Sequence, residues 1–307
     1  MTTRHEERTQ RWQFGEIAVT CVVEGQFEHI PPELFFPAAT AEQVAAHDWV
    51  SPTWADEAGR IGLRVQALVV ETPTRRILVD PCVGNGKTLT LPFWNDQSFP
   101  FLERFHDAGF DPTTIDAVLH THLHEDHIGW DTHRVGDDWV PTFPNARHVY
   151  VREALDALRV SDRPDAASSL HESIDPIIAA GLADLIDDPV SGPLDLGEGL
   201  SLVATPGHMA AHVSLWITPA GSSERVLVTG DFVHHPVQLG EPEWAEIGDV
   251  DADVARATRR RMFTEAAASG AFVIGTHFPT EPAGRIVAHG NTWRFVAADG
   301  PPAADGP

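Results

Sequence analysis

Histidines and a carboxylate gather in one short stretch of this sequence. Residues 122–127 read His-Leu-His-Glu-Asp-His and follow directly on an apolar run. In extended backbone, side chains two residues apart project to the same side, so His122 and His124 can share one metal ion. Asp126 and His127 follow as the chain turns, and they can face a second ion. Imidazole nitrogens and carboxylate oxygens without thiolates suit Zn²⁺, with Mn²⁺, Fe²⁺ or Co²⁺ as alternatives.

Three further residues of ligand type each follow an apolar run. His208 lies in Thr-Pro-Gly-His, Asp231 in Val-Leu-Val-Thr-Gly-Asp and His277 in Phe-Val-Ile-Gly-Thr-His. Open sheets place their functional groups at the carboxyl ends of strands, so each residue is a candidate partner for the 122–127 cluster. His234 follows Asp231 closely, and it is a candidate hydrogen-bond donor to a developing oxyanion or a support for a neighbouring ligand.

The order of these motifs resembles the metallo-β-lactamase superfamily. HxHxDH comes first, then TPGH, then Gly-Asp and Gly-Thr-His at strand ends, within roughly residues 63–296. The resemblance implies an α+β fold, an αββα sandwich of two mixed β-sheets flanked by helices, with a dinuclear site at one edge. It also implies a ligand set: His122, His124 and His208 for the first metal, Asp126, His127 and His277 for the second, and Asp231 bridging both.

Within the superfamily, the chain is most similar to the lactonase and methyl-parathion-hydrolase-like group. It has a long segment before the first metal motif and a Gly-Asp-x-x-His sequence that ends at His234. The true lactamases have a cysteine near the position of Asp231, and neither Cys21 nor Cys82 is close to it in sequence. N-acyl homoserine lactonases often have a tyrosine where His234 stands, so the resemblance argues against that substrate and leaves lactone and ester hydrolysis open.

We therefore expect a zinc-dependent hydrolase with two metal ions, in which a metal-bound hydroxide attacks the carbonyl of a lactone or ester. Asp126, which can accept a proton bound for the leaving group, and His234 are the expected catalytic side chains. A phosphotriesterase of the methyl-parathion-hydrolase kind is the first alternative. A mononuclear iron oxidoreductase resembling persulfide dioxygenases is the second, and the complete second ligand set argues against it. A non-enzymatic scaffold is disfavoured because no ligand is missing.

Aromatic residues near these motifs are candidates for an apolar substrate pocket, with plain core packing as the competing explanation. The candidates are Phe36, Trp54, Trp94, Trp130 and Phe278. Two of them belong to residues 26–62, a long aromatic stretch with weak periodicity. Such stretches often act as lids or substrate-binding segments.

Length, composition and charge restrict the number of domains, the partners and the location that we expect. With 307 residues, of which 42% are apolar, the chain can bury a sizeable core, and no linker divides residues 1–298, so one domain is expected. A disordered tail is expected at 299–307. The net charge of −24 disfavours nucleic acid and anionic membranes as partners. Without a signal-peptide pattern or a long apolar run, we expect a cytoplasmic protein with a neutral, fairly apolar substrate, and a homodimer stays open.

Apolar periodicity predicts the elements that must position these groups. Strands are expected within 12–24 and at 63–71, 75–80, 115–119, 147–151, 200–204, 212–218, 226–229, 271–275, 285–289 and 293–296. Helices are expected at 101–108, 153–159, 174–186 and 254–269. In the last helix, Val254, Ala257, Met262 and Ala266 form the expected apolar side, and Arg259 lies outside it.

Overall fold

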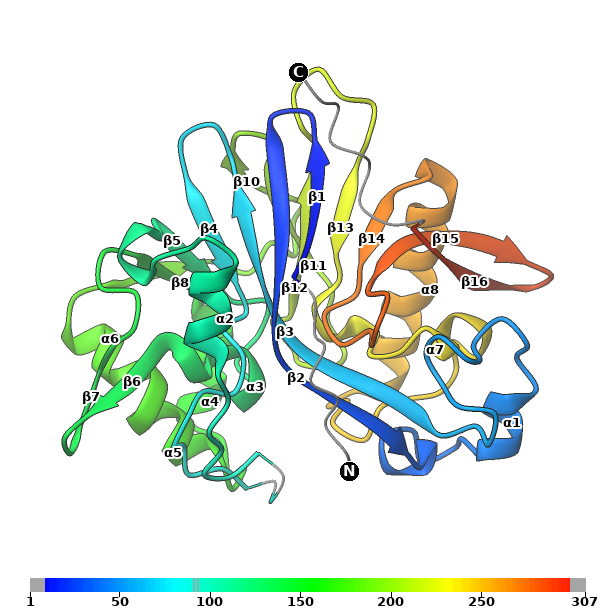
Figure 1. Ribbon diagram of the computed structural model, residues 1–307, viewed down its shortest axis with the longest axis horizontal. Coiled ribbons are helices and arrows are strands. Elements are labelled where there is room, and N and C mark those ends of the chain that lie inside the picture. Colours follow the sequence, from blue (N-terminus) through cyan, green and yellow to red (C-terminus); the bar gives the residue numbers. More distant parts are fainter. Residues whose placement is uncertain (1–8, 91, 93, 299–307) are drawn as a thin grey trace. The chain divides into compact units, whose positions relative to one another are not determined.

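The computed structural model describes residues 9–90, 92 and 94–298 (Figure 1). The chain divides into two compact units. The first unit holds the described residues up to Gly25 together with Val65–Asp188, and the second unit holds Gln26–Arg64 and the described residues from Pro189 on. The tail expected to be disordered, 299–307, lies outside the described residues.

The first unit is built on a seven-stranded mixed sheet. Its strands are β1 (Gln10–Phe14), β2 (Ile17–Ile30), β3 (Ile61–Glu71), β4 (Arg76–Val79), β5 (Ala117–Leu119), β8 (Arg147–Val151) and β9 (Ala183–Ile186), in the spatial order β1-β2-β3-β4-β5-β8-β9. β1 pairs with β2 and β3 with β4 in antiparallel fashion, whereas β4, β5, β8 and β9 run parallel. β2 and β3 continue into residues of the second unit. The strands predicted at 63–71 and 75–80 are confirmed as β3 and β4, which pair as a hairpin.

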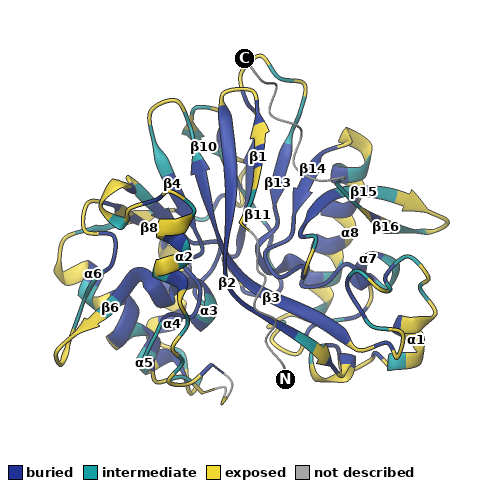
Figure 2. Ribbon diagram, in the orientation of Figure 1, coloured by how far each residue is buried: buried dark blue, intermediate teal, exposed yellow. Residues whose placement is uncertain are grey.

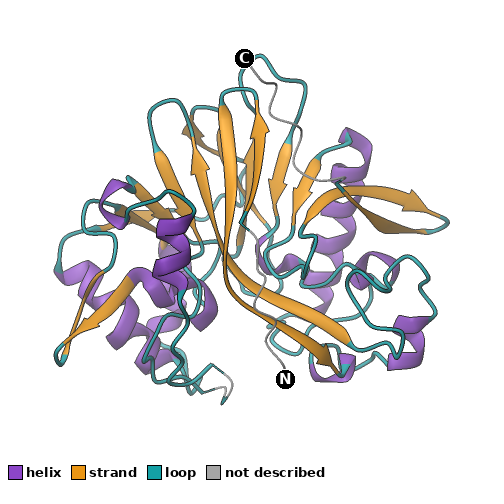
Figure 3. Cartoon of the chain, in the orientation of Figure 1, coloured by secondary structure: helices purple, strands orange, loops and turns teal. Residues whose placement is uncertain are grey.

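Among its described residues, the first unit also contains five short α-helices. They are α2 (Phe101–Asp107), α3 (Glu125–Ile128), α4 (Arg152–Arg159), α5 (Ala166–Ser169) and α6 (Asp175–Ala179). α4 buries Ala154, Leu155 and Leu158 and contacts β8. A two-stranded hairpin, β6 (Thr132–Val135) and β7 (Asp138–Pro141), which the sequence did not predict, lies against α6. Figure 3 shows these helices beside the strands of their unit.

The helix predicted at 174–186 is wrong in its second half. A π-helical turn, Leu170–Ile174, leads into α6, which ends at Ala179, and Gly181 then reverses the chain with a φ of 71°. Residues 183–186 form β9 instead and pair in parallel with β8. The apolar pattern of this stretch is compatible with a helix, but pairing with the open edge of β8 takes precedence because it satisfies that strand's backbone groups.

The second unit holds another seven-stranded mixed sheet. Its strands are β10 (Leu194–Gly197), β11 (Leu200–Ala204), β12 (Val213–Ile217), β13 (Val226–Val228), β14 (Phe272–Ile274), β15 (Ala283–His289) and β16 (Thr292–Ala297), paired in chain order. β13 and β14 run parallel and the other pairs antiparallel. β12, β13 and β14 are buried throughout, as shown in dark blue in Figure 2. Two mixed sheets with attached helices confirm the predicted α+β class.

The longest helix of the second unit is α8 (Ala252–Ser269), which contacts β15. The Asp251 side chain caps its first turn by accepting from two backbone N–H groups, and Gly270 ends it at a φ of 64°. The predicted apolar side of this helix is partly wrong. Val254 and Ala257 are exposed, and Arg259 is fully buried. The helix is rotated relative to the expected face because α8 packs against the chain around His208, as described below.

Residues 26–62, expected to form a lid or substrate segment, contain regular structure. They include the end of β2, a 3-10 turn at Pro32–Leu34 and α1 (Ala41–Ala45), which begins with a capping box between Thr40 and Gln43. The short helix α7 (Val237–Gly240) contacts β16 in the same unit. Within residues 9–90, 92 and 94–298, no helix combines the length and the apolar composition needed to cross a membrane.

A buried carboxylate joins the strand ends in the first unit. Asp131 Oδ1 accepts hydrogen bonds from His120 Nε2 at 2.9 Å and His148 Nδ1 at 3.0 Å, and Oδ2 accepts one from the Tyr150 hydroxyl at 2.7 Å. Burial by itself raises the pKa of Asp131, but the two histidines outweigh it and hold this pKa well below its usual range. The carboxylate therefore ties the exits of β5 and β8 to the 3-10 turn Gly129–Asp131.

We expect Asp131→Asn to lower the free energy of unfolding at pH 7 by about 3 kcal/mol or more, because it breaks a buried charged network. The pKa of Asp131 is depressed in the folded protein, so its contribution is present above the unfolded value of about 3.9 and is lost as the pH falls further. Urea unfolding at pH 7 checks the first point, and a series from about pH 5 down to about pH 2 checks the progressive loss. Asp137→Asn, at a fully exposed position, is the control. Equal losses in the two variants would contradict the expectation.

Candidate metal centre

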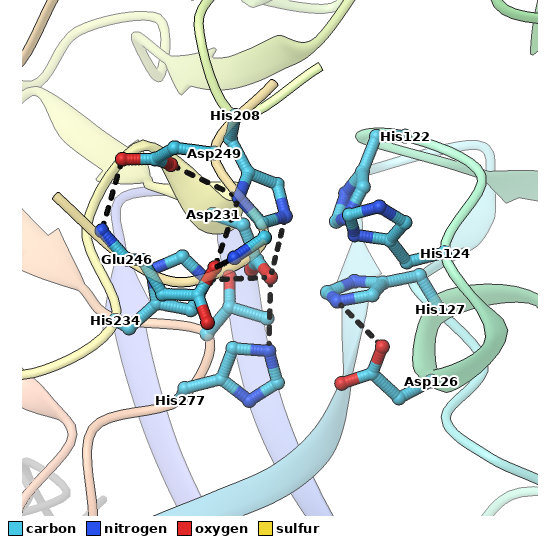
Figure 4. A network of polar contacts seen from close by, with 12 residues as sticks. His122, His124, Asp126, His127, His208, Asp231, His234, Glu246, Asp249 and His277 are labelled. Atoms are coloured by element: carbon cyan, nitrogen blue, oxygen red, sulfur yellow. Dashed lines mark hydrogen bonds and ion pairs between the residues drawn. The ribbon is translucent and has the colours of Figure 1, made fainter. Parts of the chain in front are cut away.

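The first unit brings together the predicted ligands of the 122–127 cluster. β5 ends at Leu119, the chain stays extended to His124, and α3 then begins. His122 Nε2 lies 2.9 Å from His124 Nδ1, and the rings of His122 and His127 have centroids 4.1 Å apart. Asp126 Oδ1 lies 3.6 Å from His127 Nε2. Figure 4 shows these side chains. The expected turn into a helix and the convergence of His122 and His124 are both present.

Asp80 supports this cluster and was not predicted as a site residue. It follows β4, and its carboxylate accepts from the backbone N–H of Thr121 at 2.8 Å and from the Thr121 hydroxyl at 2.7 Å. Its Oδ2 also lies 3.0 Å from His127 Nδ1. The signal available in the sequence was an acidic residue at the exit of an apolar strand, the same signal that identified Asp231. Asp80 therefore orients His127 and the residue that precedes His122.

In the second unit, Asp231 is the centre of the predicted ligands. Its Oδ2 lies 3.2 Å from Nε2 of His277, 3.2 Å from Nε2 of His234 and 3.7 Å from Nε2 of His208 (Figure 4). Asp231 follows β13, His277 follows β14, and His208 lies in the turn between β11 and β12. Because β13 and β14 are parallel neighbours, their carboxyl ends place Asp231 and His277 at the same edge of the sheet.

The other ring nitrogens of these histidines contact fixed acceptors. His277 Nδ1 donates to the carbonyl oxygen of Arg64 at 2.7 Å, and His208 Nδ1 donates to Asp249 Oδ1 at 3.2 Å. His127 Nδ1 faces Asp80 in the same way. We assign the tautomers from these contacts. A proton on Nδ1 leaves a lone pair on Nε2, which in each case points toward a carboxylate oxygen.

This arrangement fits a divalent metal ion. Two lone pairs that face each other repel, so a cation, either a proton or a metal ion, has to lie between imidazole and carboxylate. Histidines that ligate metals almost always donate their second N–H to a carboxylate or a backbone carbonyl, as His208 and His277 do. The donors are nitrogen and oxygen without sulfur, the set that suits zinc and other divalent transition metals. Both units therefore contain His/Asp clusters able to bind metal.

His234 lies next to two of these ligands. Its ring centroid is 4.8 Å from that of His208, and its ring stacks with that of His277 at 5.7 Å with an interplanar angle of 1°. Its Nδ1 is buried and has no hydrogen-bond partner among the residues that the structure describes. One nitrogen of His234 thus contacts Asp231, and the other is available for a further contact.

Glu246 is a second carboxylate that the sequence analysis missed. One of its oxygens, one nitrogen of His208 and one of His234 lie within 4.8 Å of one another. Burial is the main cause that raises the pKa of Glu246 to about 7. Glu246 lies in the loop before α8, outside any motif, so nothing in its local sequence distinguished it from a surface glutamate.

The aromatic pocket candidates are all buried within their own units. In the first unit, Trp130 stacks on Phe101 at 5.4 Å and donates its indole N–H to Glu24 Oε1 at 2.6 Å, and Trp94 is buried. In the second unit, Phe36 lies 6.2 Å from Trp244, Trp54 donates to the carbonyl oxygen of Glu281 at 3.0 Å, and Phe278 packs edge-on against Phe295. These are contacts of core residues, and a role toward substrate stays a prediction.

Comparisons with known proteins agree with this geometry. The family model described as Metallo-beta-lactamase superfamily matches residues 60–274. A relative named probable metallo-hydrolase YflN, from Bacillus subtilis (strain 168), is 31% identical over 125 residues, which are 39% of this chain and 45% of the relative. The aligned part thus spans less than half of that relative.

Solved structures show the same fold at low sequence identity. The dizinc quorum-quenching lactonase AidC superposes with a TM-score of 0.76 and 18% identity, over 94% of this chain and 97% of AidC. The hydrolase AbOPH, placed in the beta lactamase superfamily, superposes with a TM-score of 0.77 and 22% identity, over 96% and 99% of the two chains. An N-acyl homoserine lactone hydrolase has a TM-score of 0.59 and 18% identity, over 88% and 94%. With the family model covering most of the chain, this protein belongs to the metallo-β-lactamase superfamily.

Proposed function

We propose that the protein is a dinuclear metal-dependent hydrolase that opens lactones or cleaves esters. The observation that carries the proposal is the orientation of the candidate ligands. In both units, histidines have one ring nitrogen close to a fixed oxygen and the other turned toward a carboxylate. The similarity in fold to lactonase structures supports lactone as the substrate class.

The ligand assignment is part of this proposal. The first ion takes His122, His124 and His208, the second takes Asp126, His127 and His277, and Asp231 bridges them. Zn²⁺ is the ion that this donor set suits best. When bound, such ions supply Lewis acidity and lower the pKa of a water molecule to about 7.

Two side chains are proposed to act on the substrate. The Asp126 side chain is 16% exposed, compared with 4% for Asp231, so it is the more accessible of the two ligand carboxylates. It accepts a proton and transfers it to the leaving alkoxide. His234 donates a hydrogen bond to the oxyanion that develops on the substrate, and its contact with Asp231 sets the direction of its ring.

A phosphotriesterase is the second candidate function. The Gly-Asp-x-x-His sequence from Gly230 to His234 favours it, because His234 occupies the position of the tyrosine that acyl-homoserine lactonases often have. An uncharged phosphotriester presents an electrophilic phosphorus with a polarisable phosphoryl oxygen, as an ester presents an electrophilic carbon with a carbonyl oxygen. A panel of lactones, carboxylic esters and phosphotriesters separates the two functions by their relative kcat/KM values.

We expect metal-replete protein to contain two transition-metal ions per chain. Inductively coupled plasma mass spectrometry after removal of loosely bound ions measures this number. A chelator should abolish hydrolysis, and added Zn²⁺, Mn²⁺ or Co²⁺ should restore it. A value of one iron ion per chain, without hydrolytic activity, would instead favour the mononuclear oxidoreductase alternative.

Asp231→Ala and His234→Ala should have different effects. Asp231→Ala is expected to remove at least one ion per chain, because it deletes the carboxylate that faces Nε2 of both His208 and His277. His234→Ala should retain both ions and lower kcat by about 100-fold, the usual cost of one oxyanion donor. Metal analysis and steady-state kinetics of the same preparations measure both effects. Full metal content and activity in Asp231→Ala would show that the ligand assignment is wrong.

The segment 26–62 is proposed to shape substrate choice. It contacts the loops that hold the candidate residues, because the Trp54 carbonyl lies 2.9 Å from His235 Nε2 and the Phe35 carbonyl accepts from the backbone N–H of Ile247 at 2.9 Å. Phe36→Leu and Trp54→Phe should therefore change the ratio of kcat/KM between short and long acyl lactones. Metal content should stay constant. An equal loss for every substrate would indicate structural support alone.

A further inference from the structure

The turn that carries His208 is held by the loop before α8 and by the first turns of that helix. The backbone N–H of Val250 donates to the His208 carbonyl at 3.1 Å, and that of Asp251 donates to the Gly207 carbonyl at 2.9 Å. The Thr258 hydroxyl donates to the Pro206 carbonyl at 2.7 Å. Gly207 has a φ of 128°, and a Cβ there would lie 2.2 Å from the Ala255 nitrogen, so α8 packs directly on this turn.

Asp249 links this loop to the His208 ring. Its side chain is 1% exposed, and its Oδ1 accepts from His208 Nδ1 at 3.2 Å. Its Oδ2 accepts from the backbone N–H of Glu246 at 3.0 Å and from Arg259 Nη1 at 3.2 Å. Both oxygens of the carboxylate are therefore bonded, and its direction relative to the His208 ring is set from three sides.

Arg259 is the last residue in the series of hydrogen bonds that runs from His208 through Asp249. Its side chain is fully buried on α8, and its Nε donates to the Pro242 carbonyl at 3.2 Å. Its Nη2 is buried without a partner among the residues that the structure describes. Replacing a buried ion pair by apolar residues is often neutral or stabilising, so stability alone does not account for a guanidinium at this position.

Glu246 also lies near the His208 ring, but it is a weaker candidate for orienting it. Its nearest oxygen lies 3.7 Å from His208 Nδ1, beyond hydrogen-bonding distance, and that oxygen accepts from the backbone N–H of Gly248. Asp249 is thus the carboxylate that contacts the His208 ring.

We propose that Asp249, held by Arg259, is a positioning residue that orients His208 so that Nε2 faces Asp231 and is available to a metal ion. The contact keeps the proton on Nδ1 and prevents the ring from rotating. Asp249 and Arg259 therefore act on metal affinity and do not touch the substrate. This inference rests on the proposed function, since His208 is a metal ligand only under that proposal.

The test uses the full-length protein and three single variants. Asp249→Asn keeps the size of the side chain but removes its charge, and Arg259→Met removes the guanidinium. Arg260→Met is the matched control, because Arg260 is the neighbouring residue on α8 and pairs with Glu243 at an exposed position. Zn²⁺ affinity is measured by competition with a chelator of known Kd. The visible spectrum of the Co²⁺-loaded protein reports on the coordination geometry.

Asp249→Asn is expected to weaken the binding of one of two ions by about 10- to 100-fold and to change the Co²⁺ spectrum. Arg259→Met should weaken the same ion by a smaller factor, and Arg260→Met should leave both ions at wild-type affinity. Wild-type affinity and an unchanged spectrum in Asp249→Asn, with loss only of thermal stability in the metal-free protein, would overturn the inference.

Two further results distinguish failure of the proposed function from failure of the inference about Asp249 and Arg259. If a single variant fails to fold, the Asp249→Asn/Arg259→Met double variant removes both buried charges together, and the same affinity measurement decides the question. If the wild-type protein binds fewer than two ions, the proposed function fails. If the wild type binds two ions and the folded variants bind them equally well, only the role of Asp249 and Arg259 is refuted.

Discussion

A histidine can serve as a directed ligand only when its second ring nitrogen is held, and much of this structure follows from that constraint. The acceptor for His277 is the Arg64 carbonyl and that for His208 is Asp249, and the carboxylate beside His127 Nδ1 is that of Asp80. Each acceptor is separated from its histidine by at least 41 residues in sequence. The direction of each lone pair is therefore a property of the tertiary fold of its unit.

Several carboxylates near His208 are buried, so water compensates their negative charge poorly when no cation is bound. Asp231, Glu246 and Asp249 are carboxylates within one buried part of the second unit. Desolvation is the largest cause of the raised pKa of Glu246, and repulsion from Asp249 and Asp231 adds to it, although His208 opposes it. A divalent ion would offset this repulsion locally. The overall charge of −24 is thus no guide to the field that a substrate would meet near these residues.

The first unit supports its ligand motif with buried polar groups beneath it. Asp131 joins His120, just before the motif, to His148 and Tyr150 on β8. Glu24 accepts from the backbone N–H of Val83 at 2.9 Å and of Gly84 at 3.0 Å, and from the indole of Trp130. Desolvation raises the pKa of Glu24 to about 7. These groups anchor the loops on both sides of α3, so the positions of Asp126 and His127 depend on residues that never approach a substrate.

The sequence by itself determined the family, the α+β class and most of the elements. Residue spacing and strand-end placement were enough to predict that His122, His124, Asp126 and His127 lie together, because residues that are close in the chain converge through local geometry. The strand exits at Asp231 and His277 were also predictable, since apolar runs ending in ligand-type residues have a clear local pattern. The strand β9 was not predictable from the sequence, because its conformation depends on pairing with the open edge of β8.

Only the tertiary structure decided which buried polar residues support the ligands. Glu246, Asp249 and Arg259 have no motif that distinguishes them from surface residues, and Arg259 was expected outside the apolar side of its helix. Asp80 follows an apolar strand, but only the structure shows which side chains it contacts. Their burial results from how α8 packs on Gly207 and how β4 lies beside β5. A hydrogen bond between residues far apart in sequence leaves no periodic pattern, because it depends on the packing of whole elements and not on the spacing of neighbours along the chain.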